Sequence, residues 1–399
     1  MAPYESDDAM GAARDEDLPT GRRKAARYVV PVAVVGVAAA TIGLVPALAD
    51  SGDPDLPKIT AQQLVDRIAK SDVQRFSGTV KVSTDLGLPN LGGLANGLAS
   101  GAAGGGDGSS ADPRSKLTEL VSGTHTLRVA ADGPDRQKLS LLESGSEYSL
   151  IHDGRDVWGY DSKSNEVHHS TTAGSRGQHR AERPPATPED FAAEALKAVD
   201  DTTSVTVDGT AQVAGRDAYK LLIKPRQSGT TVGAVSIAVD ARTGMPLKFT
   251  LTPRSGGAAV LDAGFTQVSF ARPAASTFDF TPPEGAKVTE EKGHGRAPEH
   301  APEGGGDLAD GLGGATVLGE GWTSIARFDT GGRGGAPSGD RGGALGGFLD
   351  SLGDQVSGKF GKGTVFSTRL VNALITDDGK VYAGAVTKDA LVKAANAGK

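Results

Sequence analysis

Short stretches of alternating apolar and polar residues follow one another between Thr124 and Ser170, and this pattern constrains the fold more than any other feature. Turn-forming residues such as Asp153-Gly154 separate the stretches. A period of two indicates half-buried strands, and closely spaced strands with turns between them favour antiparallel pairing. We therefore predict a meander of strands at Thr126–Ala131, Gln137–Leu142, Glu147–His152, Asp156–Tyr160 and Glu166–Ser170.

Further strand patterns lie on both sides of this meander. Before it, Val80 and Val82 alternate with polar neighbours. After it, apolar runs are again bounded by turn residues, which is typical of an antiparallel sheet. The later strands are predicted at Ser204–Val207, Ala218–Pro225, Val235–Asp240, Pro246–Pro253 and Val260–Phe270.

Two helices are predicted within this strand-rich part. Thr60 and Gln63 form a capping box at the start of one of them. The other begins at Thr187, which is a preferred N-cap residue and is followed by Pro188 at the first helical position. The apolar positions of the two helices are Leu64, Val65 and Ile68, and Phe191, Ala195, Leu196 and Val199.

Glycine-rich stretches interrupt the regular pattern in the C-terminal part of the chain. Residues 292–315 are predicted to be a linker, and residues 316–399 a C-terminal αβ extension. A helix capped by Thr387 is predicted at the end of the extension. The other elements predicted there are strands at Trp322–Phe328, Thr364–Arg369, Asn372–Thr376 and Val381–Val386, and a helix near Leu345–Leu352.

The N-terminus indicates export. Residues 1–27 form an acidic tail that ends in a basic cluster, and residues 28–49 are an apolar run without a charge. The composition of the tail indicates disorder, and its basic end holds it in the cytoplasm. Because the run has no polar face, it is not a helix of a soluble core. We therefore expect the remainder of the chain to be extracytoplasmic.

Two interpretations of residues 28–49 stay open. The run ends in Ala47-Leu48-Ala49, the small-x-small pattern at which signal peptidase cleaves. Its length, however, is close to the roughly 20 residues of a stable membrane span. The segment is therefore either a cleaved signal peptide or one N-terminal hydrophobic helix that anchors the chain to the cell membrane.

Composition excludes several classes of function. The formal net charge of −7 argues against a nucleic-acid partner, because neutralising phosphates needs a basic face. The chain has no cysteine, which excludes disulfides, thiolate metal sites and a cysteine nucleophile. Many of its 57 glycines lie in stretches such as residues 86–112, which we predict to be a flexible insertion in the sheet.

No pattern in the sequence predicts catalysis, a metal site or a cofactor. His168 and His169 are adjacent in a predicted strand, so they point to opposite faces and cannot bind one metal together. The residues from Gly353 to Lys359 nearly match a phosphate-binding loop, but Phe360 replaces the hydroxyl residue that would bind Mg²⁺. No nucleophile elbow is present. We therefore predict that the chain is not an enzyme.

Two stretches resemble a known family. From Asp153 to Val167, the order of Asp-Gly, Trp158, Tyr160-Asp161 and Asn165 resembles a hairpin of the LolA-like outer-membrane lipoprotein carriers and of the related RseB (MucB) sensors. A longer stretch resembles the same family in its strand, its Thr-Gly-x-Pro-Leu hairpin and its proline-rich closing segment. These lie at Val213–Leu221, Val239–Leu247, Phe265–Phe270 and Phe278–Gly285.

The resemblance covers residues 58–290 and implies an α+β fold. This fold is a strongly curved antiparallel sheet, or open half-barrel, that is closed by helices around an apolar cavity for lipid acyl chains. Pro282-Pro283 cannot donate to a strand ladder and is expected to end the sheet. The residues that we predict to line the cavity are Leu64, Ile68, Trp158, Phe191, Leu196 and Phe249.

The sequence therefore favours an extracytoplasmic carrier that holds the acyl chains of a lipid or an acylated lipoprotein. The alternative is an RseB-like envelope sensor that binds a membrane-protein partner, an anti-sigma factor, and the length of residues 316–399 favours it. The two hypotheses differ in whether this extension completes the barrel or folds separately.

Overall fold

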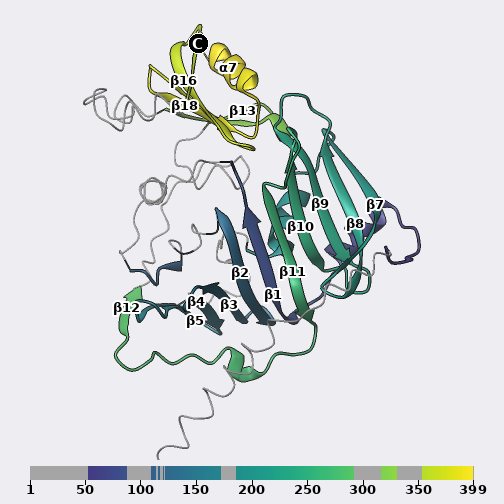
Figure 1. Ribbon diagram of the computed structural model, residues 1–399, viewed down its shortest axis with the longest axis vertical. Coiled ribbons are helices and arrows are strands. Elements are labelled where there is room, and N and C mark those ends of the chain that lie inside the picture. Colours follow the sequence, from purple (N-terminus) through teal and green to yellow (C-terminus); the bar gives the residue numbers. More distant parts are fainter. Residues whose placement is uncertain are drawn as a thin grey trace, which may run out of the picture. The chain divides into compact units, whose positions relative to one another are not determined.

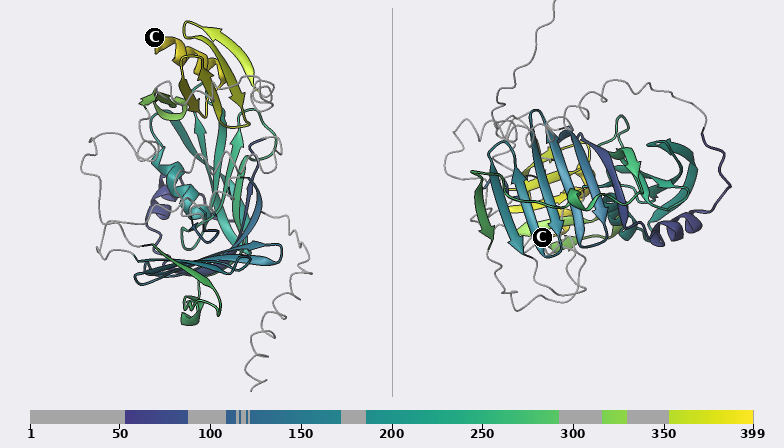
Figure 2. Two further views of the ribbon diagram at one scale, coloured as in Figure 1. Left: turned by 90° about the vertical axis from the view of Figure 1, so that its left-hand side faces the viewer. Right: turned by 90° about the horizontal axis from the view of Figure 1, so that it is seen from below.

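The strands predicted between Thr124 and Ser170 all form, and they belong to a sheet of 12 strands. In the computed structural model the strand order of this larger sheet is β12-β6-β5-β4-β3-β2-β1-β11-β10-β9-β8-β7. Its described neighbours pair antiparallel except β12 and β6, which are parallel. The sheet is strongly curved, and its edge strands β12 and β7 do not pair with each other (Figures 1 and 2). The predicted open, curved sheet is thus confirmed.

The strands of the larger sheet have the following bounds: β1 Arg75–Thr84, β2 Gly123–Asp132, β3 Arg136–Glu143, β4 Ser146–Asp153, β5 Asp156–Asp161, β6 Glu166–Thr171, β7 Thr203–Val213, β8 Arg216–Pro225, β9 Val232–Asp240, β10 Pro246–Pro253, β11 Leu261–Ser269 and β12 Lys287–Glu291.

The structure describes residues 53–87, 109–113, 116, 120, 122–171, 186–291, 316–329 and 353–398. The predicted N-terminal tail, the hydrophobic run at 28–49 and the helix near Leu345–Leu352 lie outside these residues. Within them, no helix is both long enough and apolar enough to cross a membrane.

Both predicted helices of the larger sheet form with the predicted caps. At α2 (Ala61–Ala69), the Thr60 hydroxyl accepts a hydrogen bond from the Gln63 backbone, and the Gln63 side chain accepts one from Thr60. At α5 (Pro188–Lys197), Thr187 and Asp190 exchange the same pair of bonds. Each box satisfies backbone donors that a helix start leaves unpaired. The two helices lie on the inner side of the curved sheet (Figure 2).

The turn between β9 and β10 shows why its sequence is Thr-Gly-x-Pro-Leu. Gly244 has a φ of +76°, which a side chain disfavours. A Cβ atom on Gly244 would also collide with the backbone carbonyl of Arg67 at the end of α2. The glycine therefore lets the hairpin and the helix approach closely.

The described residues from 316 onward form a separate, smaller sheet with the order β13-β14-β18-β17-β16-β15. Helix α7 (Lys388–Ala397) packs on it and begins at Thr387, as predicted. The smaller sheet has its own apolar core, which includes Leu374, Tyr382 and Leu391. Its strands are β13 Thr316–Leu318, β14 Ile325–Asp329, β15 Asp354–Gly358, β16 Gly361–Ser367, β17 Asn372–Thr376 and β18 Lys380–Gly384.

Two predicted boundaries are wrong, although the strand predicted at Trp322–Phe328 does form as β14 (Ile325–Asp329). Trp322 does not begin a strand, because residues Gly321–Thr323 form the 3-10 helix η2 and β14 begins only at Ile325. The pair Pro282-Pro283 does not end the sheet. The chain leaves β11, passes through η1 (Ala275–Thr277), crosses beneath the strands β1 to β6 and returns as β12 beside β6 (Figure 1). The prolines interrupt pairing only locally, and Lys287 resumes it at the opposite edge.

Candidate apolar binding face

The inner face of strands β7 to β10 carries rows of apolar side chains. Residues directly opposite each other in neighbouring antiparallel strands share a face of the sheet. The strand register therefore defines two complete rows: Val205, Ile223, Val235 and Leu251, and then Val207, Leu221, Ile237 and Phe249. Tyr219 and Val239 begin a third row. Three of these side chains are fully buried: Leu221, Ile223 and Ile237. Other parts of the chain must therefore cover the rows.

The cover comes from α2 and α5. Leu64 of α2 and Ala192 of α5 are each 0% exposed and belong to the same apolar cluster as the rows. Phe191 of α5 stacks on Phe249 of β10, with ring centres 5.4 Å apart. The two helices thus fill the inner side of this part of the sheet with their own side chains.

Phe191 also contacts a second apolar cluster, on the inner face of β1 to β4 and β11. This second cluster includes Val80, Leu127, Tyr148 and Phe265, all of which are buried. Because Phe191 packs against both clusters, α5 stands where they meet. The inner face is therefore one continuous apolar surface that reaches from β4 to β7.

Each end of the rows on β7 to β10 has a large side chain. At one end, the guanidinium of Arg67 lies 5.6 Å from the ring centre of Tyr219, and its Nη1 donates a hydrogen bond of 2.6 Å to the Ala241 carbonyl. At the other end, Trp322 packs against the cluster, and its Nε1 donates to the Thr203 hydroxyl at 2.7 Å.

Five of the six predicted lining residues come together on this face. Leu64 and Phe249 are buried members of the cluster, and Ile68, Phe191 and Leu196 are partly buried against it. Their role in binding stays a prediction, because no ligand contact tests it.

The sixth predicted residue, Trp158, lies on the opposite face of the sheet. Its ring stacks on His169 with centres 3.7 Å apart and lies 5.6 Å from Phe280, in the segment that crosses to β12. Tyr160 also contacts Phe280, at 5.7 Å. Trp158 therefore fastens the crossing segment to the outer face and does not meet the other five residues.

His169 links the edge strand β12 to the rest of the sheet. Its ring nitrogens lie 2.9 Å from Asp156 of β5 and 2.7 Å from Glu290 of β12. Burial opposes protonation of the ring, but the hydrogen bonds to both carboxylates outweigh it and raise the pKa of His169 above 6.5. The charged form is therefore the one that holds β12.

The raised pKa predicts a pH dependence. The contribution of His169 to stability should be complete below pH 6.5 and should disappear as the pH rises through the raised value. The free energy of unfolding in urea is measured for the unaltered protein and for His169→Asn, at one pH below 6.5 and at one pH well above it. The two proteins should differ in stability more at the acidic pH. A difference that is the same at both pH values would contradict this assignment.

A short segment before β2 covers the inner face of β4 to β6. The Tyr148 hydroxyl donates to the Ala111 carbonyl at 3.2 Å, and the Ser110 amide donates to Glu166 at 3.0 Å. Lys116 lies 3.1 Å from Glu143 and 3.2 Å from the buried Asp161. Residues 109–112, the described end of the predicted flexible insertion, are thus packed against the sheet.

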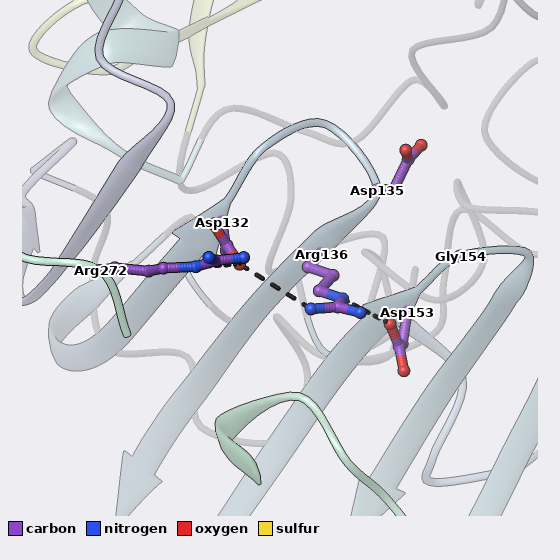
Figure 3. A pocket seen from close by; sticks show the side chains of 6 residues that line it. All are labelled: Asp132, Asp135, Arg136, Asp153, Gly154 and Arg272. Carbon is purple, nitrogen blue, oxygen red and sulfur yellow. Dashed lines mark hydrogen bonds and ion pairs between the residues drawn. The ribbon is translucent and has the colours of Figure 1, made fainter. Parts of the chain in front are cut away.

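A polar pocket of about 390 Å³ lies at the turns β2–β3 and β4–β5. Figure 3 shows Arg136 between Asp132 and Asp153, with Arg272 on the other side of Asp132. These cations are paired with carboxylates, and the lining is charged. This pocket is not the apolar cavity that the sequence predicts.

Metal chemistry has no visible basis in the part of the chain that the structure describes. These residues contain no group of three or more histidine or acidic side chains that could hold an ion. His168 and His169 do not share a face, since His168 pairs with Gly159 while His169 stacks on Trp158.

The geometry defines a class of protein: an open, curved antiparallel sheet with an apolar inner face that two short helices cover. No family model and no curated protein matches the chain. Solved structures do match. MucB in the MucA/MucB complex of Pseudomonas aeruginosa has 17% identity and a TM-score of 0.37, and the match covers 84% of this chain and 96% of that one.

Two further matches cover a smaller share of this chain. A LolA superfamily protein from Nitrosomonas europaea has 10% identity and a TM-score of 0.22, covering 56% of this chain and 99% of that one. An uncharacterized conserved protein from Thermus thermophilus has 14% identity and a TM-score of 0.32, covering 58% and 99%. The families named by these structures include those that the hairpin motifs resemble.

Sequence reasoning did not identify Trp322 or Tyr219 as members of this face. Tyr219 and Leu221 are two residues apart in β8 and therefore share a face, so the strand period of two could have grouped Tyr219 with the core. For Trp322, the signal was the pair of nearby glycines before it, Gly319 and Gly321, which indicates a turn and not a strand. Both glycines adopt positive φ in the structure.

Proposed function

We propose that this chain is an extracytoplasmic binding protein that takes an acyl chain of a lipid or lipoprotein onto the inner face of its larger sheet. One observation carries the proposal: the continuous apolar surface from β4 to β7, with α5 placed where its two clusters meet. The apolar run at residues 28–49, which we predict to be either a signal peptide or a membrane anchor, supports the location.

Binding requires α5 to move, because its side chains fill the space above the sheet. Only Pro188 and Ala192 among its ten residues are buried, and its other apolar side chains keep part of their surface exposed. Elements with few buried apolar contacts open at low cost. An acyl chain that enters between α5 and the rows recovers about 0.8 kcal/mol for each methylene removed from water. No charged site is needed for useful affinity.

The two tryptophans of the chain provide the test. Trp322 packs against the apolar cluster, whereas Trp158 lies on the outer face. In Trp158→Phe, which retains Trp322, a lysophospholipid with a brominated acyl chain should strongly quench the emission. In Trp322→Phe, which retains Trp158, the same lipid should have little effect. Equal quenching in both variants, or in neither, would contradict binding on the inner face.

A second candidate is the envelope sensor that binds a membrane protein. The observation that favours it is the separate core of the smaller sheet, which does not complete the larger one. Val317 of β13 is 54% exposed and offers an apolar contact there. A photo-crosslinker at Val317, compared with one at the exposed Gln355 of β15, should capture one membrane protein in cells if this candidate holds. The absence of a Val317-specific product would count against it.

A further inference from the structure

Trp322 belongs to the smaller sheet by its position in the chain, yet its indole completes the apolar cluster of the larger one. It lies in η2, between β13 and β14. Its ring packs against the cluster that holds the rows on β7 to β10. The face proposed to bind acyl chains thus takes one of its walls from a different sheet.

Specific hydrogen bonds hold both the ring and the backbone of Trp322. The Thr203 hydroxyl donates to the Asp200 carboxylate at 3.2 Å, which leaves a lone pair to accept the indole N–H at 2.7 Å. The backbone amide of Trp322 donates to the side-chain oxygen of Gln227 at 2.9 Å. The Gln227 amide in turn donates to the Glu320 carbonyl at 3.2 Å. Backbone and ring are therefore held independently.

The approach of this loop is also close. Gly321 has a φ of +59°, and a Cβ atom there would lie 2.7 Å from the Thr202 hydroxyl. Such a contact is shorter than real Cβ atoms make, so only glycine brings the loop this near. The hydrogen bonds of Trp322 and the close approach at Gly321 together fix the position of the ring.

The strand register places the ring at the end of the apolar rows. Val205 and Ile223 are opposite each other in the last row, and Thr203 is opposite Pro225 just beyond it. Because Thr203 binds the indole, the ring stands past the last row. A chain that lies along the strands runs from Arg67 and Tyr219 at one end to Trp322 at the other.

We propose that Trp322 is a length gauge, the end wall that sets the longest acyl chain the inner face can hold. This inference rests on the proposed function. Affinity should rise by about fourfold for each added methylene, at about 0.8 kcal/mol each, until the chain reaches the ring. Beyond that length the added methylenes gain nothing, because they must displace a hydrogen-bonded indole or remain in water.

The test is a chain-length profile measured on the full protein. Saturated lysophosphatidylcholines with lauroyl, myristoyl, palmitoyl, stearoyl and arachidoyl chains are titrated, and binding is followed by native mass spectrometry. In the unaltered protein, affinity should rise and then level off. In Trp322→Ala the affinity should stop rising only at a longer acyl chain, and each methylene past the former limit should raise the affinity about fourfold. Trp322→Phe keeps most of the wall and should retain the original limit.

Two controls keep the result decisive. Trp158→Ala removes a ring of the same kind from the outer face and should leave the limit unchanged. Trp322→Leu should give a smaller shift in the same direction and replaces the alanine variant if that variant does not fold. If the acyl chains bind and the length limit is the same in every variant, Trp322 is not the length gauge, and the proposed function still stands. Failure of every chain to bind any variant overturns the proposed function itself.

Discussion

Replacing Asp240 by alanine is expected to lower the free energy of unfolding by about 3–5 kcal/mol, because it leaves a charged partner and turn amides unpaired at a buried site. Asp240 is 1% exposed. It accepts hydrogen bonds from the guanidinium of Arg216, from the amides of Arg242 and Thr243, and from the Thr243 hydroxyl. Urea unfolding measures the loss, and Asp217→Ala, at the adjacent exposed carboxylate, should change the stability little.

The same site predicts a dependence on acid. Burial works against ionisation, but the hydrogen bonds from Arg216 and Thr243 outweigh it and lower the pKa of Asp240 below 3.8. Its contribution is therefore present above pH 3.8 and is lost as the pH falls through the lowered value. Asp240→Asn should remove this part of the acid sensitivity. An alanine variant as stable as the original protein would show that the carboxylate does not hold the β9–β10 turn.

Replacing Leu196 by glutamate is expected to weaken acyl-chain binding by roughly a hundredfold or more. Leu196 is partly buried against the apolar cluster, so in the free protein a carboxylate there can still reach water. A bound chain would remove that water, and burying an unpaired polar group costs about 2–7 kcal/mol. The measurement is quenching of Trp322 by the brominated lysophospholipid in the Trp158→Phe background.

Val199→Glu is the matched control for this variant. Val199 lies three residues further along the chain and is 37% exposed. Its carboxylate would stay in water whether or not a lipid is bound, so binding should be unchanged. Equal weakening in both variants would point to a general charge effect on lipid association, and unchanged binding in Leu196→Glu would place the site elsewhere.

The sequence predicted the local elements of the larger sheet well because their signals are local. Thr60 with Gln63, and Thr187 with Pro188, carry their cap chemistry within one helical turn, and both helices begin there. The strands between Thr124 and Ser170 are bounded by turn residues that act on their immediate neighbours. Such features do not depend on the rest of the chain.

The errors concern contacts between distant parts. The return of the chain as β12 depends on an edge of β6 more than 100 residues earlier, and no local pattern encodes it. Trp322 looked like a strand residue because tryptophan favours strands, but its partners Thr203 and Gln227 lie in the larger sheet or directly beside it. Tertiary contacts decided both cases.

The candidate site was predictable in part for the same reason. Helical period groups Leu64 with Ile68, and Phe191 with Leu196, on the buried faces of α2 and α5, and the structure brings these faces together. Alternation in β5 shows that Trp158 and Tyr160 share a face but not which face is the inner one. Register and curvature supply that information, and they place Trp158 outside.

The central claim is that the inner face of the larger sheet holds acyl chains. The most direct measurement is native mass spectrometry of the full protein extracted from the envelope of its own cells, with chemical identification of whatever co-purifies. The account predicts one lipid or acylated peptide per chain, lost in Leu196→Glu and kept in Val199→Glu. A protein that carries no such molecule, and gains no mass when lysophospholipids or acylated peptides are added, would contradict it.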